Sequence, residues 1–186
     1  MLILASASPR RRELLGQAGY EFLVQAAHIN EDLREGENPL AYVTRLAEEK
    51  ARAIFEVAGD PGAVVLGADT TVVLDNHIMG KPEDEADAGR MLRLLSGRTH
   101  RVITGVSLLS AERVETAAEV TAVQFLSLSD VEIETYIRTG EPMDKAGAYA
   151  IQGYAARWIP RIEGCYFNVV GLPISLVSTM LGGFGA

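Results

Sequence analysis

The sequence predicts one domain of mixed helix and strand, of the α/β or α+β class. The chain has 186 residues, which is near the size of an ordinary domain and enough to bury a core without disulfides or structural metal. Hydrophobic residues make up 48% and charged residues 23%, as in average soluble proteins. Strand-like and helix-like segments follow one another along the chain. These observations exclude disorder, collagen and coiled coil.

The N-terminal segment is predicted to form a strand, a turn and a helix. Leu2–Ala5 is a short apolar run and predicts a buried strand. Ser8 and Pro9 then supply an N-cap and a first-turn proline. We therefore expect a helix from this point to about Gly19.

A longer helix and a second strand are expected next. Apolar residues recur near helical spacing from Pro39 to Ala58, and Gly59-Asp60-Pro61 stops that helix. Val64–Leu74 is rich in β-branched residues and predicts a strand, which we expect to be interrupted at Gly67-Ala68-Asp69. Asp75-Asn76 then marks a turn.

The second half of the chain contains strong signals for the starts and ends of both helices and strands. They predict an acidic helix start at residues 83–85 that continues to Gly97, antiparallel strands at Arg101–Leu109 and Val114–Leu126, a helix from Ser129 to about Thr139, and a last helix after Pro173. We find no internal repeat and no linker, so one domain is expected.

Charge and cysteine content narrow the classes of partner. The net charge of −8, from 17 basic and 25 acidic residues, argues against nucleic acid or an anionic membrane as a partner. The single cysteine, Cys165, cannot form an internal disulfide, and no Cys or His cluster offers a zinc site. The N-terminus has an apolar run before its arginines, the reverse of a secretory signal, and no run is long enough to span a membrane. We expect a cytoplasmic protein.

Ser8-Pro9-Arg10-Arg11-Arg12 places arginines at a helix start, where the helix dipole disfavours cations. Backbone N–H groups, a hydroxyl and guanidinium groups at one helix N-terminus make a good phosphate site. A solvated basic turn explains the same residues equally well.

Gly67-Ala68-Asp69-Thr70-Thr71 places a carboxylate inside an apolar strand. An aspartate is a poor strand residue and is costly to bury without a partner. The pattern indicates a cation partner or a strand break at a functional site. The alternative is a hydrogen-bonded structural aspartate in a bulge made by Gly67.

Weaker candidates come from three further places. Gly80-Lys81-Pro82 is an ordinary turn by itself, but a strand that turns and returns could bring Lys81 towards Asp69. Glu31 with Asp32, and Lys50 in the long helix, also fit a solvated surface. Carboxylates near a phosphate site nevertheless suit a hard divalent cation.

Asp144–Gly153 combines small residues with two charges and the amide of Gln152. Such a segment packs tightly and lets the backbone approach a ligand. A buried connection in which Asp144 and Lys145 merely pair is an equally good explanation.

Five short blocks occur in a distinctive order: Leu4–Arg11, Gly67–Thr70, Gly80–Pro82, Leu95–His100 and Asp144–Gly153. Each is weak alone, but together they closely resemble the Maf family. The resemblance extends from Leu2 to about Leu181.

This resemblance implies an elongated α/β fold similar to inosine triphosphate pyrophosphatases. It would have a mixed central sheet, flanking helices and a nucleotide cleft between two lobes, in one domain over residues 1–186. The implied activity is hydrolysis of a nucleoside triphosphate to its monophosphate and pyrophosphate with Mg²⁺ or Mn²⁺, by a homodimer. The Asp-Lys-Ala-Gly-Ala-Tyr form of the last block resembles the subgroup that acts on dTTP and UTP.

The resemblance also assigns roles to residues at matching positions. Asp69 matches the catalytic acid or base and a metal ligand. Glu31 matches another pocket position, and we expect it to be the second metal ligand. Asn30 stands where the family often has an acid, which leaves open whether Glu31, Asp32 or both approach the metal. The positions that match the substrate pocket are Ser8, Arg10, Arg11, Lys50, Thr70, Lys81 and Gln152, of which Arg10, Thr70 and Gln152 match positions implicated in substrate choice.

Gln152 has a physical reason to select uracil and thymine. Its carboxamide offers an acceptor and donors that match the N3–H and carbonyl edge of these bases. We expect rejection of CTP but poor separation of UTP from dTTP. One competing function is a non-catalytic nucleotide-binding regulator of cell division, against which the carboxylate of Asp69 argues. A second alternative, within the same reaction class, is a housecleaning pyrophosphatase that acts on inosine or modified nucleotides.

Overall fold

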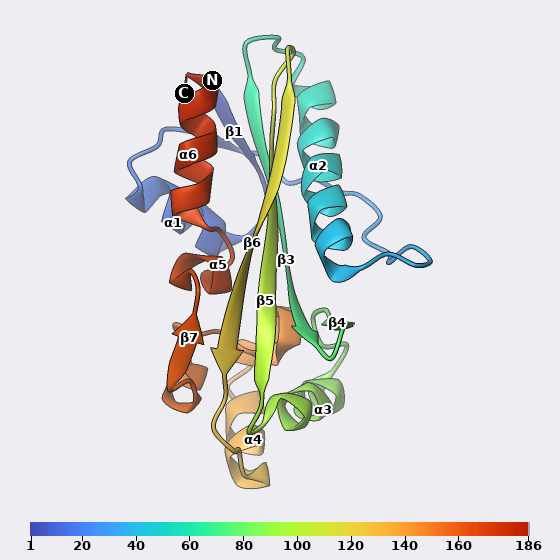
Figure 1. The fold of residues 1–186 in the computed structure, drawn as a ribbon, viewed down its shortest axis with the longest axis vertical. Helices are drawn as coiled ribbons and strands as arrows, with labels where there is room; N and C mark the ends of the chain where they lie inside the picture. The colour runs from blue at the N-terminus through green and yellow to red at the C-terminus, as the bar shows by residue number, and fades with distance from the viewer. Residues whose placement is uncertain (186) are drawn as a thin grey trace. The chain divides into compact units, whose positions relative to one another are not determined.

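The computed structural model describes residues 1–185 and has a mixed α/β fold (Figure 1). Its strands form one seven-stranded sheet in the order β2-β1-β3-β5-β6-β7, with β4 paired to β3. The elements in chain order are β1 (Leu2–Ala5), α1 (Pro9–Gln17), β2 (Leu23–Val24), α2 (Pro39–Ala58), β3 (Val64–Leu74), β4 (His77–Met79), α3 (Glu85–Leu95), β5 (Thr99–Leu109), β6 (Val114–Gln124), α4 (Asp130–Ile137), the 3-10 helices η1 (Glu141–Asp144), η2 (Ala146–Ala148) and η3 (Tyr154–Trp158), β7 (Arg161–Glu163), α5 (Tyr166–Val170) and α6 (Ile174–Phe184).

The central sheet is mixed, as predicted. β1 pairs in parallel with both β2 and β3, whereas β3 with β4 and β6 with β7 are antiparallel. Helices flank the strands (Figure 1), so the predicted α/β class is confirmed. No helix among the described residues is long and apolar enough to cross a membrane.

The chain divides into two compact units that share the strands β3, β5 and β6. Unit 1 comprises Met1–Thr70, Thr104–Glu119 and the C-terminal segment from Gly171, and unit 2 comprises Thr71–Ile103 and Val120–Val170. The candidate site residues fall in both units, so each unit is described in turn.

Unit 1 begins with the predicted strand, turn and helix. β1 is completely buried, and Ser8 caps α1 by accepting a hydrogen bond at its Oγ from the Arg11 N–H. The helix ends at Gln17, slightly before the expected end near Gly19. Gly19 has a φ of +85°, a conformation that a helix cannot continue and that glycine adopts without strain.

The long helix α2 has the predicted bounds and lies very close to the sheet. Two strand glycines allow this approach, since a Cβ on Gly67 would lie 2.0 Å from the Ala47 carbonyl oxygen, and one on Gly105 would lie 2.3 Å from that of Val43. α1 and α6 lie on the opposite side of these strands from α2 (Figure 1). The core beneath α2 is apolar and includes Ile3, Ala51, Ile54, Val65 and Leu109.

The predicted interruption of the Val64–Leu74 strand is wrong. β3 is continuous through residues 67–69, and its parallel register with β1 runs as far as the pair Ala5 and Gly67. Gly67 serves the close approach of α2 rather than a bulge. Asp69 can stay in the strand because it has a cation partner, described below.

Unit 2 opens with a hairpin that the sequence predicted only in part. Asp75 and Asn76 both have positive φ, 49° and 65°, as the predicted turn requires. The strand β4 that follows is too short to give a periodic signal. The acidic helix α3 starts at Glu85 with Asp84 as its N-cap, not at Glu83.

β5 and β6 are neighbouring strands joined by a short turn, as predicted. The Ser110 N–H donates to the Arg113 carbonyl across this turn at 2.9 Å. β6 ends at Gln124 rather than Leu126, because the Leu126 N–H donates instead to the Trp158 carbonyl.

The C-terminal part of unit 2 packs around one apolar core. α4 starts at Asp130, with the predicted Ser129 as its N-cap in a capping box with Glu132, and ends at Ile137 rather than near Thr139. The core residues come from α3, α4, the strands, η3 and the segments beside β6 and η2, and include Leu92, Val102, Val123, Phe125, Tyr136, Tyr149 and Trp158. β7, α5 and the 3-10 helices were not predicted. α6 follows Pro173, as expected.

Candidate functional site

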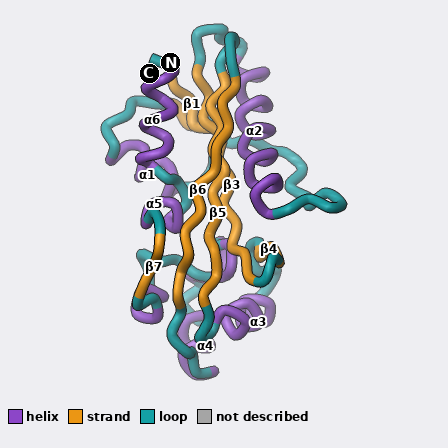
Figure 2. Tube along the Cα trace, viewed as in Figure 1, coloured by secondary structure: helices purple, strands orange, loops and turns teal. Residues whose placement is uncertain are grey.

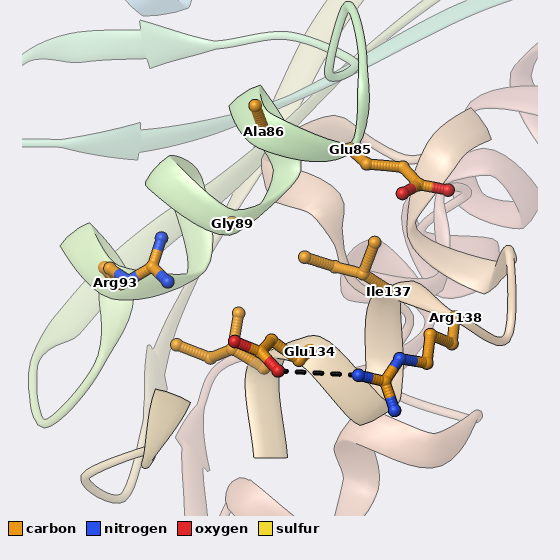
Figure 3. A pocket seen from close by; sticks show the side chains of 8 residues that line it. Glu85, Ala86, Gly89, Arg93, Glu134, Ile137 and Arg138 are labelled. Carbon is orange, nitrogen blue, oxygen red and sulfur yellow. Dashed lines mark ion pairs between the residues drawn. The ribbon is translucent and has the colours of Figure 1, made fainter. Parts of the chain in front are cut away.

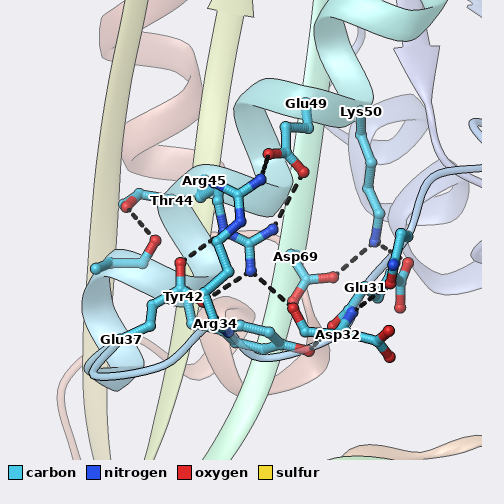
Figure 4. Close-up of polar contacts among 12 residues, drawn as sticks. Glu31, Asp32, Arg34, Glu37, Tyr42, Thr44, Arg45, Glu49, Lys50 and Asp69 are labelled. Atoms are coloured by element: carbon cyan, nitrogen blue, oxygen red, sulfur yellow. Dashed lines mark hydrogen bonds and ion pairs between the residues drawn. The ribbon is translucent and has the colours of Figure 1, made fainter.

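Lys50 on α2 holds two carboxylates together in unit 1 (Figure 4). Its Nζ lies 2.7 Å from Asp69 Oδ1 and 2.6 Å from Glu31 Oε1. Lys50 and Asp69 are each only 8% exposed, whereas the Glu31 side chain is more than half exposed. The cation partner predicted for Asp69 is therefore Lys50, one of the weaker candidates from the sequence.

Asp69 is a buried carboxylate that binds a proton more readily than an exposed aspartate does. Burial raises the pKa of Asp69, and the positive charges of Lys50 and Arg11 offset only part of this effect. A carboxylate of raised pKa that also keeps an ion-pair partner is suited to accept a proton.

The Arg11 guanidinium is bound almost entirely by protein oxygens. Its Nε donates to the Gly171 carbonyl at 2.8 Å, and its Nη1 donates to the Ala68 carbonyl at 2.8 Å and to Ser6 Oγ at 3.2 Å. Its Nη2 donates to Thr70 Oγ1 at 2.9 Å. These bonds use four of its five N–H donors, so Arg11 organises the site and leaves one donor for a ligand.

The charge of Arg11 has no direct carboxylate partner among these bonds. Burial lowers the pKa of its guanidinium, and the negative charge of Asp69 acts in the opposite direction. Asp69 and Arg11 therefore attract each other electrostatically within unit 1, although no hydrogen bond or ion pair joins their side chains.

Thr70 follows Asp69 on β3, and its hydroxyl is engaged within unit 1. Oγ1 accepts from Arg11 and lies 2.9 Å from Thr104 Oγ1 and 3.3 Å from the Gly171 carbonyl oxygen. This network fixes the orientation of the Thr70 side chain.

The Glu31 carboxylate is carried by a segment without helix or strand, drawn in teal between β2 and α2 in Figure 2. Two residues of α2 hold this segment. The Tyr42 hydroxyl donates to the Glu31 carbonyl at 2.9 Å, and Arg45 Nη2 donates to the Asp32 carbonyl at 3.1 Å. Asp32 thus contributes its backbone, whereas Glu31 contributes the carboxylate that pairs with Lys50.

Arg45 also anchors the segment through a nearly buried ion pair (Figure 4). Its Nε and Nη2 donate to the two oxygens of Glu37 at 2.6 and 2.7 Å, and Nη1 donates to Glu49 at 3.1 Å. The hydrogen bonds from Arg45 lower the pKa of Glu37 to about 2. Burial and the charges of Asp69 and Glu31 raise the pKa of Tyr42 to about 12, so its hydroxyl keeps its proton.

Ser8 and Arg10 lie at the N-terminus of α1, as predicted. The Ser8 hydroxyl is the helix cap, and its N–H donates to Ser6 Oγ at 3.2 Å. Because Ser6 also accepts from Arg11, the helix start and the Arg11 network are connected. Arg10 is half-buried.

The other two predicted pocket residues, Lys81 and Gln152, belong to unit 2 and are both exposed. Their segments lie together, because the Gly147 N–H donates to the Gly80 carbonyl at 3.0 Å. Gly147 has a φ of +67°, and a Cβ there would lie 2.8 Å from Val72. Two of the sequence motifs are thus joined through a glycine that no other residue could replace without strain.

A hollow of about 270 Å³ lies between α3 and α4 in unit 2 (Figure 3). It contains none of the predicted site residues. Its walls are Ala86, Gly89, Ile133, Ile137 and the charged side chains Glu85, Arg93, Glu134 and Arg138.

The residues that could hold a metal are few. Within residues 1–185 no group of three or more His, Cys, Asp and Glu side chains is placed to bind an ion. Asp69 and Glu31, joined by Lys50, are the pair of carboxylates that the structure brings together at the predicted site.

Sequence reasoning missed Tyr42 and Arg45, which hold the Glu31 segment. Tyr42 and Arg45 are three residues apart and are neighbours on the helix surface, but Lys50 is five residues after Arg45, about 140° further round the helix, so the spacing did not connect all three. His100 was given no role, yet it is buried with its Nε2 2.7 Å from the Tyr149 hydroxyl. Burial lowers the pKa of His100 to about 4.

Comparison with known proteins identifies the family to which this chain belongs. A family model described as Maf-like protein matches residues 1–184. The chain belongs to the Maf family. The match covers all five of the sequence blocks and both units of the fold.

Curated relatives of the Maf chain are close and of similar length. A protein of Koribacter versatilis named dTTP/UTP pyrophosphatase is 57% identical over 182 residues, which are 97% of this chain and 92% of the relative. A protein of Citrifermentans bemidjiense with the same name is 54% identical over 187 residues, covering 100% and 96%. Among solved structures, the Ham1 protein of Staphylococcus aureus aligns with a TM-score of 0.47 at 14% identity over 98% of each chain.

Proposed function

We propose that this protein hydrolyses dTTP and UTP to the nucleoside monophosphate and pyrophosphate. The observation that carries the proposal is the buried pair of Asp69 and Lys50, a carboxylate of raised pKa kept beside an ammonium group. The names of the close relatives support the substrate class.

The reaction adds one water across the anhydride bond between the α and β phosphates. The oxygen of the water bonds to the α-phosphorus, the bond from this phosphorus to the bridging oxygen breaks, and pyrophosphate leaves. Little covalent work is required of the protein, because orientation and charge neutralisation lower most of the barrier. Asp69 accepts the proton of the attacking water, for which its raised pKa suits it.

Lys50 and Arg11 supply positive charge beside this base. Lys50 orients the Asp69 carboxylate through a 2.7 Å contact, and the remaining N–H donor of Arg11 is available to a phosphate oxygen. The capped N-terminus of α1 at Ser8 adds backbone N–H groups and the positive end of a helix dipole. Lys81 and Gln152 complete the proposed substrate contacts.

The carboxylate pair fits a hard divalent cation. Mg²⁺ is commonly bound by one or two carboxylates together with substrate phosphates and water, and Asp69 and Glu31 are two carboxylates brought together by Lys50. We propose that these two residues would hold Mg²⁺ or Mn²⁺. When bound, the ion neutralises charge on the phosphate oxygens.

The test is release of pyrophosphate from dTTP, UTP, CTP and the purine triphosphates with Mg²⁺ or Mn²⁺. We expect hydrolysis of dTTP and UTP by the wild type and a loss of about 10²-fold or more in Asp69→Asn, which cannot act as a base. Glu48→Gln, at a half-buried α2 residue paired with Arg52 and away from Asp69, is the matched control. A wild type that binds these nucleotides but hydrolyses none with either metal would favour the non-catalytic regulator instead.

A further inference from the structure

Gln152 lies in a tight turn in unit 2. The Gly153 N–H donates to the Ala150 carbonyl at 3.1 Å, which makes Ile151 and Gln152 the two central residues of a four-residue turn. Ile151 is buried and Gln152 is exposed. The backbone of this turn therefore decides where the carboxamide can reach.

Both ends of the turn are held by one pair of side chains, Tyr136 of α4 and Glu141 of η1. At the first end, the Ala150 N–H donates to the Tyr136 hydroxyl oxygen at 3.2 Å. Just after the last end, the Tyr154 N–H donates to Glu141 Oε1 and Oε2 at 3.2 and 3.3 Å. The Tyr136 hydroxyl donates to Glu141 Oε1 at 2.7 Å and joins the two ends.

Gly153 leaves the room that the Glu141 carboxylate occupies. A Cβ at this position would lie 2.2 Å from Glu141 Oε1 and 2.5 Å from its carboxyl carbon. Any residue that replaced Gly153 would have to displace the Glu141 carboxylate. The glycine of this turn and the acid of η1 are therefore sterically dependent on each other.

The pair is itself held in place. Tyr136 is fully buried, and its ring stacks on that of Tyr154 with centroids 5.4 Å apart and an interplanar angle of 16°. Lys145 Nζ donates to the Glu141 carbonyl at 2.7 Å, which fixes the backbone that carries the carboxylate. Few rearrangements are open to such a connected group without breaking several bonds.

We propose that Tyr136 and Glu141 are positioning residues that determine base specificity by holding the Gln152 turn. This inference rests on the proposed function. It extends that function from the Gln152 carboxamide, which would hydrogen-bond the base, to the side chains of Tyr136 and Glu141, which would position Gln152. A carboxamide discriminates between bases only if its acceptor and donors are held in register with the base edge.

The experiment compares kcat/KM for UTP with kcat/KM for CTP. Glu141→Ala removes the shared acceptor and Tyr136→Phe removes the hydroxyl. Both are expected to lower the UTP to CTP ratio roughly tenfold, because a misplaced hydrogen-bonding group loses its discrimination. Glu141→Gln keeps one acceptor oxygen and should recover part of the ratio. Glu134→Gln, an exposed residue of α4 paired at 3.5 Å with Arg138, is the matched control with an unchanged ratio.

A further variant perturbs the pair of Tyr136 and Glu141 without changing either of these two side chains. Gly153→Ala places a methyl group against the Glu141 carboxylate and should lower the ratio in the same direction. Thermal unfolding of each variant shows that it is folded, and the ratio is measured below its transition.

The outcomes separate the two proposals. A wild type that hydrolyses no UTP overturns the proposed function. A wild type that prefers UTP, with Gln152→Ala losing this preference while folded Glu141→Ala, Tyr136→Phe and Gly153→Ala variants keep it, overturns only the role of the two positioning residues. An unchanged preference in Gln152→Ala also overturns it, because the turn would then carry no specificity.

Discussion

Lys50 and Asp69 form an ion pair in which each side chain is almost completely removed from solvent, at 10% and 12% exposure. Both charges have lost most of their hydration, so each depends on the other. Lys50→Met should therefore lower the free energy of unfolding by about 3 kcal/mol or more, because it leaves a buried carboxylate without its partner. Urea denaturation measures this loss.

Two further variants test whether the loss comes from the pair. Arg52→Met removes an exposed α2 cation that is half solvent-accessible beside Glu48 and should cost less than about 1 kcal/mol. Adding Asp69→Asn to Lys50→Met should restore part of the stability, since no unpaired charge then remains. Purely additive effects of the two changes would contradict the coupling.

Gly67→Ala should strongly destabilise unit 1. Its Cβ would meet backbone atoms of α2, the Ala47 carbonyl oxygen at 2.0 Å and the Ala51 nitrogen at 2.8 Å. Because a helix backbone cannot move aside as a flexible side chain can, we expect a loss of about 3 kcal/mol or more, at the upper end of overpacking effects. Thermal or urea unfolding checks this value.

Gly16→Ala is the matched control for that substitution. Gly16 lies in α1 with no atom within 4 Å of an added Cβ. The alanine should stabilise the protein by about 0.5–1 kcal/mol through helix propensity. Equal losses at Gly67 and Gly16 would refute the close approach of α2 and β3.

His100 predicts a pH dependence of stability. Burial lowers its pKa to about 4 in the folded protein, below the ordinary value near 6.5. Between these two pH values the unfolded chain binds more protons than the folded protein does. The free energy of unfolding is therefore highest above pH 6.5, and it falls by about 2–3 kcal/mol as the pH falls towards 4. The measurement is urea unfolding at a series of pH values.

The comparison variant for this prediction is His100→Phe. It keeps a ring against Phe125 and Tyr149, which pack edge-to-face on His100, but it removes the titration. Its stability should change less between pH 6.5 and 4 than that of the wild type, whatever its absolute value. Identical slopes in the two proteins would show that His100 is not the group responsible.

Arg45→Met should free the segment that carries Glu31. Arg45 supplies the bonds to Asp32 and Glu37 that hold this segment on α2. We expect amide hydrogen exchange in residues 30–37 to become about tenfold faster or more, because local opening no longer breaks these bonds. Mass spectrometry of deuterium uptake measures the change by segment.

Arg34→Met serves as the control for that experiment. Arg34 lies in the same segment and its side chain is 65% exposed, with one ion pair to Glu49. Its loss should leave exchange in the segment nearly unchanged. If both arginine variants accelerate exchange to the same extent, Arg45 has no special part in holding Glu31.

The parts of the fold that the sequence predicted are those with local causes. The bounds of α2 were correct because a proline begins the helix and Gly59 adopts a left-handed conformation at its end. The Ser8 cap and the turn at Asp75-Asn76 were correct for the same reason. The interruption of β3 was wrong, because a polar residue in a strand is tolerated once a distant partner pairs with it.

The sequence named the residues that the structure joins in unit 1, but it did not give their arrangement. The sequence indicated that Asp69 needs a cation, but the spacing gave no way to choose Lys50, 19 residues earlier on another element. Glu31 and Asp32 were equivalent by sequence, and only the fold shows that one contributes its side chain and the other its backbone. Arg11 looked like a phosphate ligand, and its four bonds to protein oxygens depend on segments far apart in the chain.

The bond between Arg11 and the Gly171 carbonyl spans 160 residues and therefore sets an order of events during synthesis. The N-terminal strand and helix leave the ribosome first, but the guanidinium cannot complete its four bonds to protein oxygens until nearly the whole chain has emerged. Closing so long a loop is slow compared with forming α1. A nascent chain consequently lacks this bond until Gly171 has been made, and a message cut short before that residue yields a chain in which Arg11 keeps at most three of its four bonds to protein oxygens.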